Sequence, residues 1–221
     1  MLRRAGFHGF ASMLDGEAEA TAVEWERGQC MLRLLDTHSW RCDMAGRLDG
    51  RSVVVLLAEG FEDLEFWVTV MRLQEEGAEV TVAGVNTEPV RGKNGLEATA
   101  DVEVETVSAD AVDAVVVPGG WAPDKLRRYD AVKDLVGKAY HQGKVVGLIC
   151  HAGLVGISAG IVDGKRATGS LGIKDDLVNA GATWVDEPAV RDGNLVWGRV
   201  VPDIPAFCRE LVAAIEAGQP G

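Results

Sequence analysis

The chain has 221 residues, of which 47% are hydrophobic and 25% charged, so its composition is that of a folded globular protein. The net charge of −12 argues against a nucleic-acid partner, because phosphate binding needs a basic surface. The sequence contains neither a run of ~18 apolar residues nor the core of a signal peptide, which argues against a membrane-spanning or secreted protein.

The cysteines also argue against a secreted protein. Cys30, Cys42, Cys150 and Cys208 lie far apart and show no CxxC spacing. This pattern is typical of reduced thiols and not of a disulfide framework or a zinc site. We therefore expect a cytoplasmic protein with no metal and no cofactor.

Residues 1–43 differ from the rest of the chain. They show no sustained period of 3.6 or 2, and Trp25 and Trp40 lie among mixed charges. We interpret them as a poorly ordered extension or a mis-assigned start, with Met44 as the alternative start. Residues 50–218 are expected to form one domain, and a deletion that begins at Met44 should keep the thermal midpoint.

From residue 52 onward the sequence alternates between strand and helix patterns. Buried strands are predicted at 52–58, 78–84, 113–117 and 144–150, and a hairpin at 90–101 around Asn94-Gly95. Helices are predicted at 63–76, 124–142 and 151–160. Shorter elements follow: a strand at 165–169, a helix at 173–181, small strands with a turn at Asp192-Gly193 within 183–198, and a helix at 205–217. This order predicts an α/β fold with a doubly wound, mostly parallel sheet between helices.

The first helix carries apolar residues around much of its circumference. Leu64, Trp67, Val68 and Met71 share one face, and Phe66, Val70 and Leu73 form an adjoining stripe. The pattern predicts a well-buried helix.

Cys150 is the main candidate for chemistry. A buried strand ends at this cysteine and a helix with small residues begins at once, which is the pattern of a nucleophile elbow. The helix N-terminus should favour the thiolate and depress the pKa of Cys150, which makes it the most reactive thiol of the chain. The alternative is a buried cysteine that packs as a small hydrophobic residue.

Three further features should lie at the same edge of the sheet, where ligands of such sheets bind. His151 could act as a base, orient the substrate or offer its backbone N–H, and Gly119-Gly120 could bring N–H groups close to an oxyanion. Glu62 could donate a hydrogen bond to the sulfur as a protonated carboxyl. Each also has a structural explanation: a histidine at a helix N-terminus, a plain turn, and an acid that complements the helix dipole.

Five segments follow one another at characteristic spacing: AEGFEDLEF, VVVPGGWAPD, LICHAG, GIKDDLVNAGATWVD and DGNLVWGR with the following DIPAFCREL. In this order they resemble the ThiJ/PfpI superfamily, which comprises PfpI-type intracellular proteases and Parkinsonism-associated deglycases. The resemblance implies a class I glutamine-amidotransferase-like, or flavodoxin-like, fold that assembles as a homodimer or as a hexamer of dimers.

The resemblance also implies roles for individual residues. Cys150 would be the nucleophile, and Glu62 would hydrogen-bond its sulfur. The backbone groups of Gly120 and His151 would form the oxyanion hole. The partner of His151 would be an acid from a neighbouring subunit, which in this chain is Asp124 where the family has glutamate.

Two segments near the expected pocket depart from the family pattern. Gly169-Ser170-Leu171 replaces a Ser-Tyr/Phe-Pro sequence, and Trp197-Gly198-Arg199 replaces Thr-Ser-Arg. We therefore expect the substrate preference to differ from that of characterised members of the family.

Three functions are compatible with the sequence. By resemblance, the first is a cysteine hydrolase that acts as a protein or nucleotide deglycase, or as a glyoxalase, on methylglyoxal and glyoxal adducts in a stress response. The second is an intracellular peptidase that uses the same nucleophile. The third is a redox-sensing stress protein or chaperone in which Cys150 is oxidised and Glu62 stabilises the oxidised form.

Overall fold

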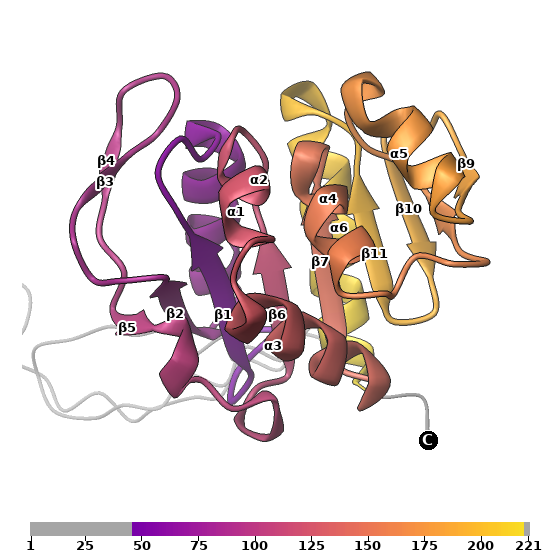
Figure 1. Ribbon diagram of the computed structural model, residues 1–221. Helices are drawn as coiled ribbons and strands as arrows, with labels where there is room; N and C mark the ends of the chain where they lie inside the picture. Colours follow the sequence, from indigo (N-terminus) through magenta and orange to yellow (C-terminus); the bar gives the residue numbers. More distant parts are fainter. Residues whose placement is uncertain (1–45, 219–221) are drawn as a thin grey trace, which may run out of the picture. The chain divides into compact units, whose positions relative to one another are not determined.

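A seven-stranded sheet forms the centre of the computed structural model, which describes residues 46–218 (Figure 1). Its strands follow the order β10 (Ala189–Asp192), β11 (Leu195–Gly198), β7 (Val145–Ile149), β6 (Ala114–Val117), β1 (Ser52–Leu57), β2 (Glu79–Gly84) and β5 (Val102–Glu103). Every neighbouring pair is parallel except β10 and β11. The prediction of a doubly wound, mostly parallel sheet is confirmed. The predicted extension 1–43, with Cys30 and Cys42, lies outside the described residues.

Helices cover both faces of the sheet (Figure 1). Helices α1 (Asp63–Glu75) and α6 (Ile204–Ala217) lie together on one face, and α2 (Ala122–Leu126), α3 (Asp130–His141) and α4 (Gly153–Ser158) lie on the other. The remaining elements are the hairpin β3 (Val90–Arg91) with β4 (Glu97–Ala98), the pair β8 (Arg166–Ala167) and β9 (Thr183–Trp184), α5 (Lys174–Asn179), and short 3-10 helices that include Cys150–Ala152 and Leu171–Ile173.

The central strands are buried on both faces, as their runs of valine, leucine and isoleucine predict. Gly147 in β7 lets α6 approach closely, since a Cβ atom there would lie 2.9 Å from Leu211 Cδ1. The core begins at Leu48, which is fully buried and donates its backbone N–H to the carbonyl of Glu76.

The structure corrects two predictions about helices. The helix expected at 124–142 is divided, because Tyr129 is extended (φ −97°, ψ 127°) and caps a separate α3. Only one of the two apolar stripes of α1 faces the core.

Phe66, Val70 and Leu73 make up the buried stripe of α1. Leu64, Val68 and Met71 are exposed by 48%, 39% and 59%. A helix that lies on a sheet directs a single stripe toward it, so most of the second stripe remains on the surface, and only its Trp67 is half-buried against the core.

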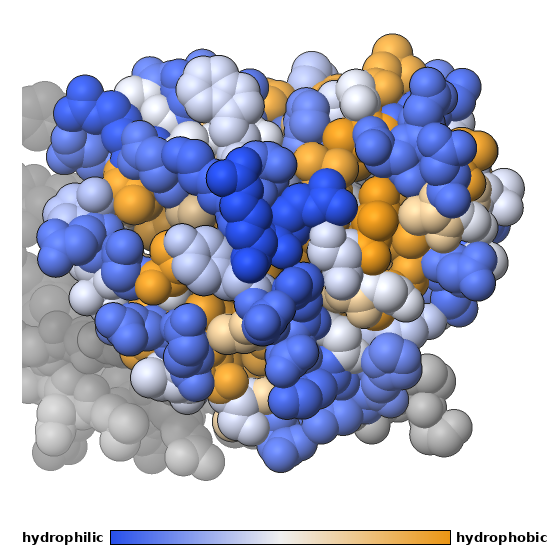
Figure 2. All heavy atoms as spheres, in the orientation of Figure 1, coloured by the Kyte–Doolittle hydropathy of each residue, from blue (hydrophilic) through white to orange (hydrophobic). Residues whose placement is uncertain are grey.

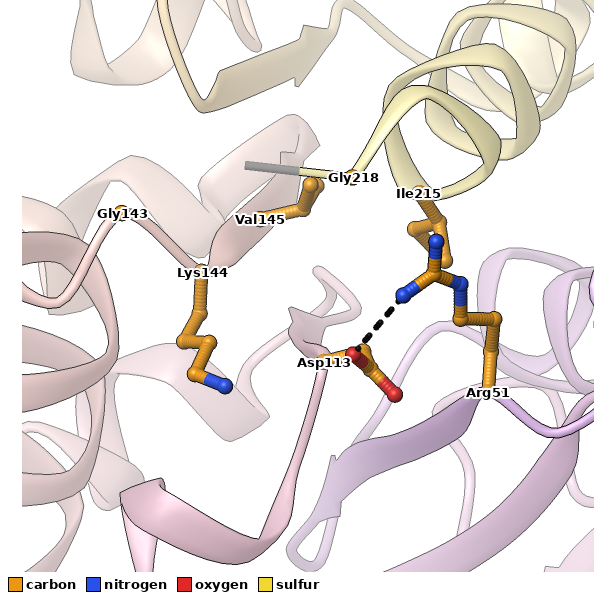
Figure 3. A pocket seen from close by; sticks show the side chains of 7 residues that line it. All are labelled: Arg51, Asp113, Gly143, Lys144, Val145, Ile215 and Gly218. Carbon is orange, nitrogen blue, oxygen red and sulfur yellow. Dashed lines mark hydrogen bonds and ion pairs between the residues drawn. The ribbon is translucent and has the colours of Figure 1, made fainter. Parts of the chain in front are cut away.

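Strands β1, β6 and β7 end at the same edge of the sheet, and the loops that follow them carry Glu62, Gly119-Gly120 and Cys150. The opposite edge holds a hollow of about 250 Å³ (Figure 3). Arg51 and Asp113 meet there at 3.2 Å beside Lys144, just before the three strands begin. This hollow is therefore separated from Cys150 by the length of the strands.

The face of the protein toward the viewer in Figure 2 is mainly hydrophilic, with apolar groups between the polar side chains. Among residues 46–218, no helix is long and apolar enough to cross a membrane.

Replacement of Gly147 by alanine should lower the free energy of unfolding by roughly 1–3 kcal/mol, because the new methyl group would press on Leu211 inside a packed core. Urea denaturation would measure the loss. Gly137→Ala is the control, since a Cβ atom in that position of α3 would make an ordinary contact of 3.4 Å, and alanine is the better helix former. Equal stability of the two variants would show that α6 does not pack on β7 this closely.

Candidate active site

Cys150 adopts a backbone conformation that is rare for a residue with a side chain. Ile149 is still extended (φ −119°, ψ 143°), whereas Cys150 has φ +61°, the only positive φ of a non-glycine residue in the described part of the chain. Such a conformation costs about 1–3 kcal/mol and persists only where the surroundings impose it. The backbone N–H of Ser170 holds the Cys150 carbonyl at 3.1 Å, and Gly169 leaves that carbonyl room. The predicted elbow geometry is present.

The two glycines after β6 fit tightly against this elbow. A Cβ atom on Gly119 would lie 2.6 Å from the Cys150 Cβ and 2.5 Å from Glu65 Oε2. Gly120 has φ +78°, and a Cβ atom there would lie 2.5 Å from the Gly60 carbonyl oxygen. The backbone N–H groups of Gly120 and His151 both donate to the sulfur. The two donors expected to form an oxyanion hole thus meet at Cys150.

The acid beside the sulfur is Glu65, and the prediction that Glu62 occupies this place is wrong. Glu62 caps helix α1: its Oε2 accepts from the Glu65 N–H at 2.8 Å and its Oε1 from the Asn94 side-chain amide at 3.0 Å. The Glu65 carboxyl is buried against Cys150, and its Oε2 accepts from the Gly119 N–H at 2.9 Å. The Glu62 carboxyl caps the helix and faces its N-terminus, whereas the Glu65 carboxyl, one turn later, reaches the thiol.

Burial and mutual repulsion govern the charges of this pair. Burial, with repulsion from Glu62, raises the pKa of Glu65 to about 7. Burial, with the charge and hydrogen bond of Glu65, raises the pKa of Cys150 to about 12, so the prediction of a depressed pKa is wrong. Between these values the pair holds one proton. When that proton lies on Glu65, the sulfur is a thiolate. Glu65 Oε1 has no hydrogen-bond partner and is therefore the oxygen that is free to hold the proton.

His151 lies next to the sulfur, with its Nδ1 at 3.3 Å from Cys150 Sγ. Burial and the positive charge of Lys93 lower the pKa of its imidazole, which favours the neutral ring. Asp124 is exposed on α2, where its carboxylate pairs with Arg128. No hydrogen bond joins Asp124 to His151 within residues 46–218.

Sequence reasoning missed two residues of the site, Glu65 and Lys93. Glu62 and Glu65 have the spacing of a helix N-cap and its third residue, which predicts that one of them caps the helix. The spacing does not determine which acid turns inward. Lys93 lies in the hairpin turn, with its Nζ 3.9 Å from Glu62 Oε1, and no local pattern in the sequence indicates this contact.

Of the two segments that depart from the family pattern, one lies at the site and the other lies away from it. Ser170 contacts the elbow through its backbone, so the first departure is at the site. Trp197 is buried in β11, with Gly153 of α4 against its ring. Arg199 pairs with Asp186 and Asp203. The second departure therefore serves the core and a surface ion-pair cluster.

Among the described residues, no group of three or more His, Cys, Asp or Glu side chains is arranged to hold a metal ion. The site is thus built from a cysteine, a buried carboxyl, a histidine and two backbone donors.

The fold and this site define an α/β protein with a cysteine at a nucleophile elbow. Residues 51–214 match the model of the DJ-1/PfpI family, and the chain belongs to this family. A deglycase of Pyrococcus abyssi is 42% identical over 74% of this chain and 99% of its own length, and the deglycase PfpI of Pyrococcus furiosus is 38% identical over the same shares. The crystal structure of Drosophila melanogaster DJ-1beta superposes with a TM-score of 0.71 at 31% identity, covering 75% of this chain and 90% of that one.

The alkylation rate of Cys150 by iodoacetamide should rise through a pH near 7, because only the pair that has lost one proton contains a thiolate. Glu65→Gln removes the group that titrates there and with it the negative charge that raises the pKa of Cys150, so the rate of this variant should keep rising above pH 7 instead of levelling off. Peptide mapping by mass spectrometry separates Cys150 from Cys208, whose pKa is also raised by burial. A profile that is unchanged in Glu65→Gln would show that Glu65 does not control the thiol.

Proposed function

We propose that this protein is a cysteine-dependent hydrolase that removes methylglyoxal or glyoxal adducts from amino and thiol groups. The observation that carries the proposal is Cys150 itself, which is held in a strained conformation between the Glu65 carboxyl and two backbone donors. A cysteine that only filled space would need neither the strain nor the buried acid. The deglycase names of the archaeal relatives support the same reaction class.

The proposed reaction uses each group once. The adduct first releases its amine or thiol, which takes up the proton of the adduct's hydroxyl group. The Cys150 thiolate adds to the aldehyde carbon that results while the proton of the pair resides on Glu65, and the oxyanion formed is stabilised by the N–H groups of Gly120 and His151. His151 then carries the proton of this carbon to the neighbouring carbonyl carbon through an enediol, so that the hemithioacetal becomes a thioester. Water hydrolyses the resulting thioester to the hydroxy acid and restores the thiol.

Peptide hydrolysis by the same nucleophile is the second candidate. It requires that His151 protonate a poor leaving amine, which calls for an oriented imidazolium. The lowered pKa of His151 and the pairing of Asp124 with Arg128 give less support to this activity. A redox role is the third candidate, since a buried carboxyl beside a thiol also suits a sulfenic or sulfinic acid, and it can coexist with catalysis.

Turnover of methylglyoxal, a glycated peptide and casein by the same preparation tests the first two candidates. Cys150→Ala should reduce kcat/KM for methylglyoxal and the glycated peptide by about 1000-fold or more, because the covalent intermediate is lost. Cys208→Ala is the control and should keep most of the turnover, because its thiol contacts Thr69 and not the site. Undiminished turnover in Cys150→Ala would overturn the proposal, and cleavage of casein alone would favour the peptidase.

We also propose that the chain acts as a homo-oligomer. The support is the exposed apolar stripe of α1, formed by Leu64, Val68 and Met71, because apolar side chains aligned on a helix favour a partner surface. A neighbouring subunit could also offer its Asp124 to His151, as the family resemblance implies.

Val68→Asp should reduce the mass measured by light scattering to that of the 23.5 kDa monomer, because a charge within the stripe opposes burial. Val178→Asp is the control, since Val178 is also an exposed valine on a helix, α5. Asp124→Asn should lower turnover without unfolding, whereas Arg128→Met, which breaks the same ion pair, should not. A fully active monomer together with an unaffected Asp124→Asn variant would contradict the shared site.

A further inference from the structure

The turn between β3 and β4 is fixed against the N-terminus of α1 by a buried carboxylate. Asp63 is 2% exposed and accepts the backbone N–H groups of Asn94 at 2.8 Å and Leu96 at 2.7 Å. Gly92 packs directly on this carboxyl, since a Cβ atom there would lie 2.6 Å from Asp63 Cγ. The backbone of the turn therefore has a defined position, and with it the attachment point of Lys93.

Lys93 holds a cation at the rim of the site. Its backbone N–H donates to the Phe61 carbonyl at 2.9 Å, and its side chain remains 33% exposed. The 3.9 Å from Nζ to Glu62 Oε1 is an ion pair but too long for a hydrogen bond. Because the Glu62 oxygens already accept from Asn94 and Glu65, the ammonium keeps donors for another anion.

The positive charge of Lys93 acts on the two side chains that flank Cys150. It lowers the pKa of Glu65, which contacts the thiol, and that of His151, which follows it in the chain. A substrate bound at Cys150 must lie among these groups. The chain as a whole is acidic, with a net charge of −12, and Lys93 places a positive charge beside this site.

We propose that Lys93 is a specificity-determining residue that binds a negatively charged group, such as a carboxylate, next to the carbon attacked by Cys150. The inference rests on the proposed function for its biological meaning. The favoured substrates are carbonyl compounds and adducts that carry an anionic group beside the reactive carbonyl. The fixed turn determines the distance at which that group is held.

Two nearly isosteric alkylating agents test this without any turnover. Iodoacetate and iodoacetamide react with the same thiolate and differ in one negative charge, so the ratio of their rates at Cys150 cancels the protonation state of the sulfur. Relative to a small free thiol, the wild type should favour iodoacetate. Lys93→Met should lower the ratio roughly three- to tenfold, as expected for one charge at this range in a partly solvated site. Lys93→Arg should retain most of the preference.

Lys138→Met is the matched control, because Lys138 lies on α3 and pairs with Asp134. Its rate ratio should equal that of the wild type. If Lys93→Met slows both agents equally, Lys93 acts only through Glu62 and the turn, and the proposal is overturned. Failure of the proposed hydrolase would appear separately, as absence of turnover with the iodoacetate preference intact.

Discussion

The positive φ of Cys150 is the constraint on which the site depends. It turns the chain abruptly from β7 into the 3-10 helix Cys150–Ala152, so that the side chain faces the loops after β1 and β6. Those loops can approach only because Gly119 and Gly120 lack a Cβ atom. The local strain is offset by the surroundings, because the buried strand β7 fixes the chain before the turn and the Ser170 N–H holds the Cys150 carbonyl.

A second consequence of this close packing is electrostatic. Glu65 and Cys150 are removed from water together, and neither can ionise without raising the pKa of the other. Glu62 adds negative charge and Lys93 offsets it, so four residues determine where a single proton resides. In this account reactivity arises from a shared proton, and the six-residue helix α4 is a minor influence on the thiol.

The sheet and the elbow could be predicted from the sequence because they depend on local pattern. Runs of β-branched residues define the buried strands, and the small residues after Cys150 define the turn. The role of Glu65 could not be predicted, since Glu62 and Glu65 are identical in type and one helical turn apart. Their difference depends on Asn94 and Gly119, which reach them from distant segments. The prediction that α1 is well buried failed for a similar reason, because periodicity identifies apolar faces of a helix but does not show which face packs on the sheet.

The protonation of Glu65 provides the most direct test of this account. Infrared difference spectroscopy across a pH titration would follow the carbonyl band of the protonated acid, identified by its absence in Glu65→Gln. The account predicts that this band persists well above the ordinary pKa of glutamate and begins to weaken near pH 7 while thiolate absorbance appears. Complete loss of the band near pH 4.5, with no linked change at the thiol, would show that Glu65 and Cys150 do not share a proton.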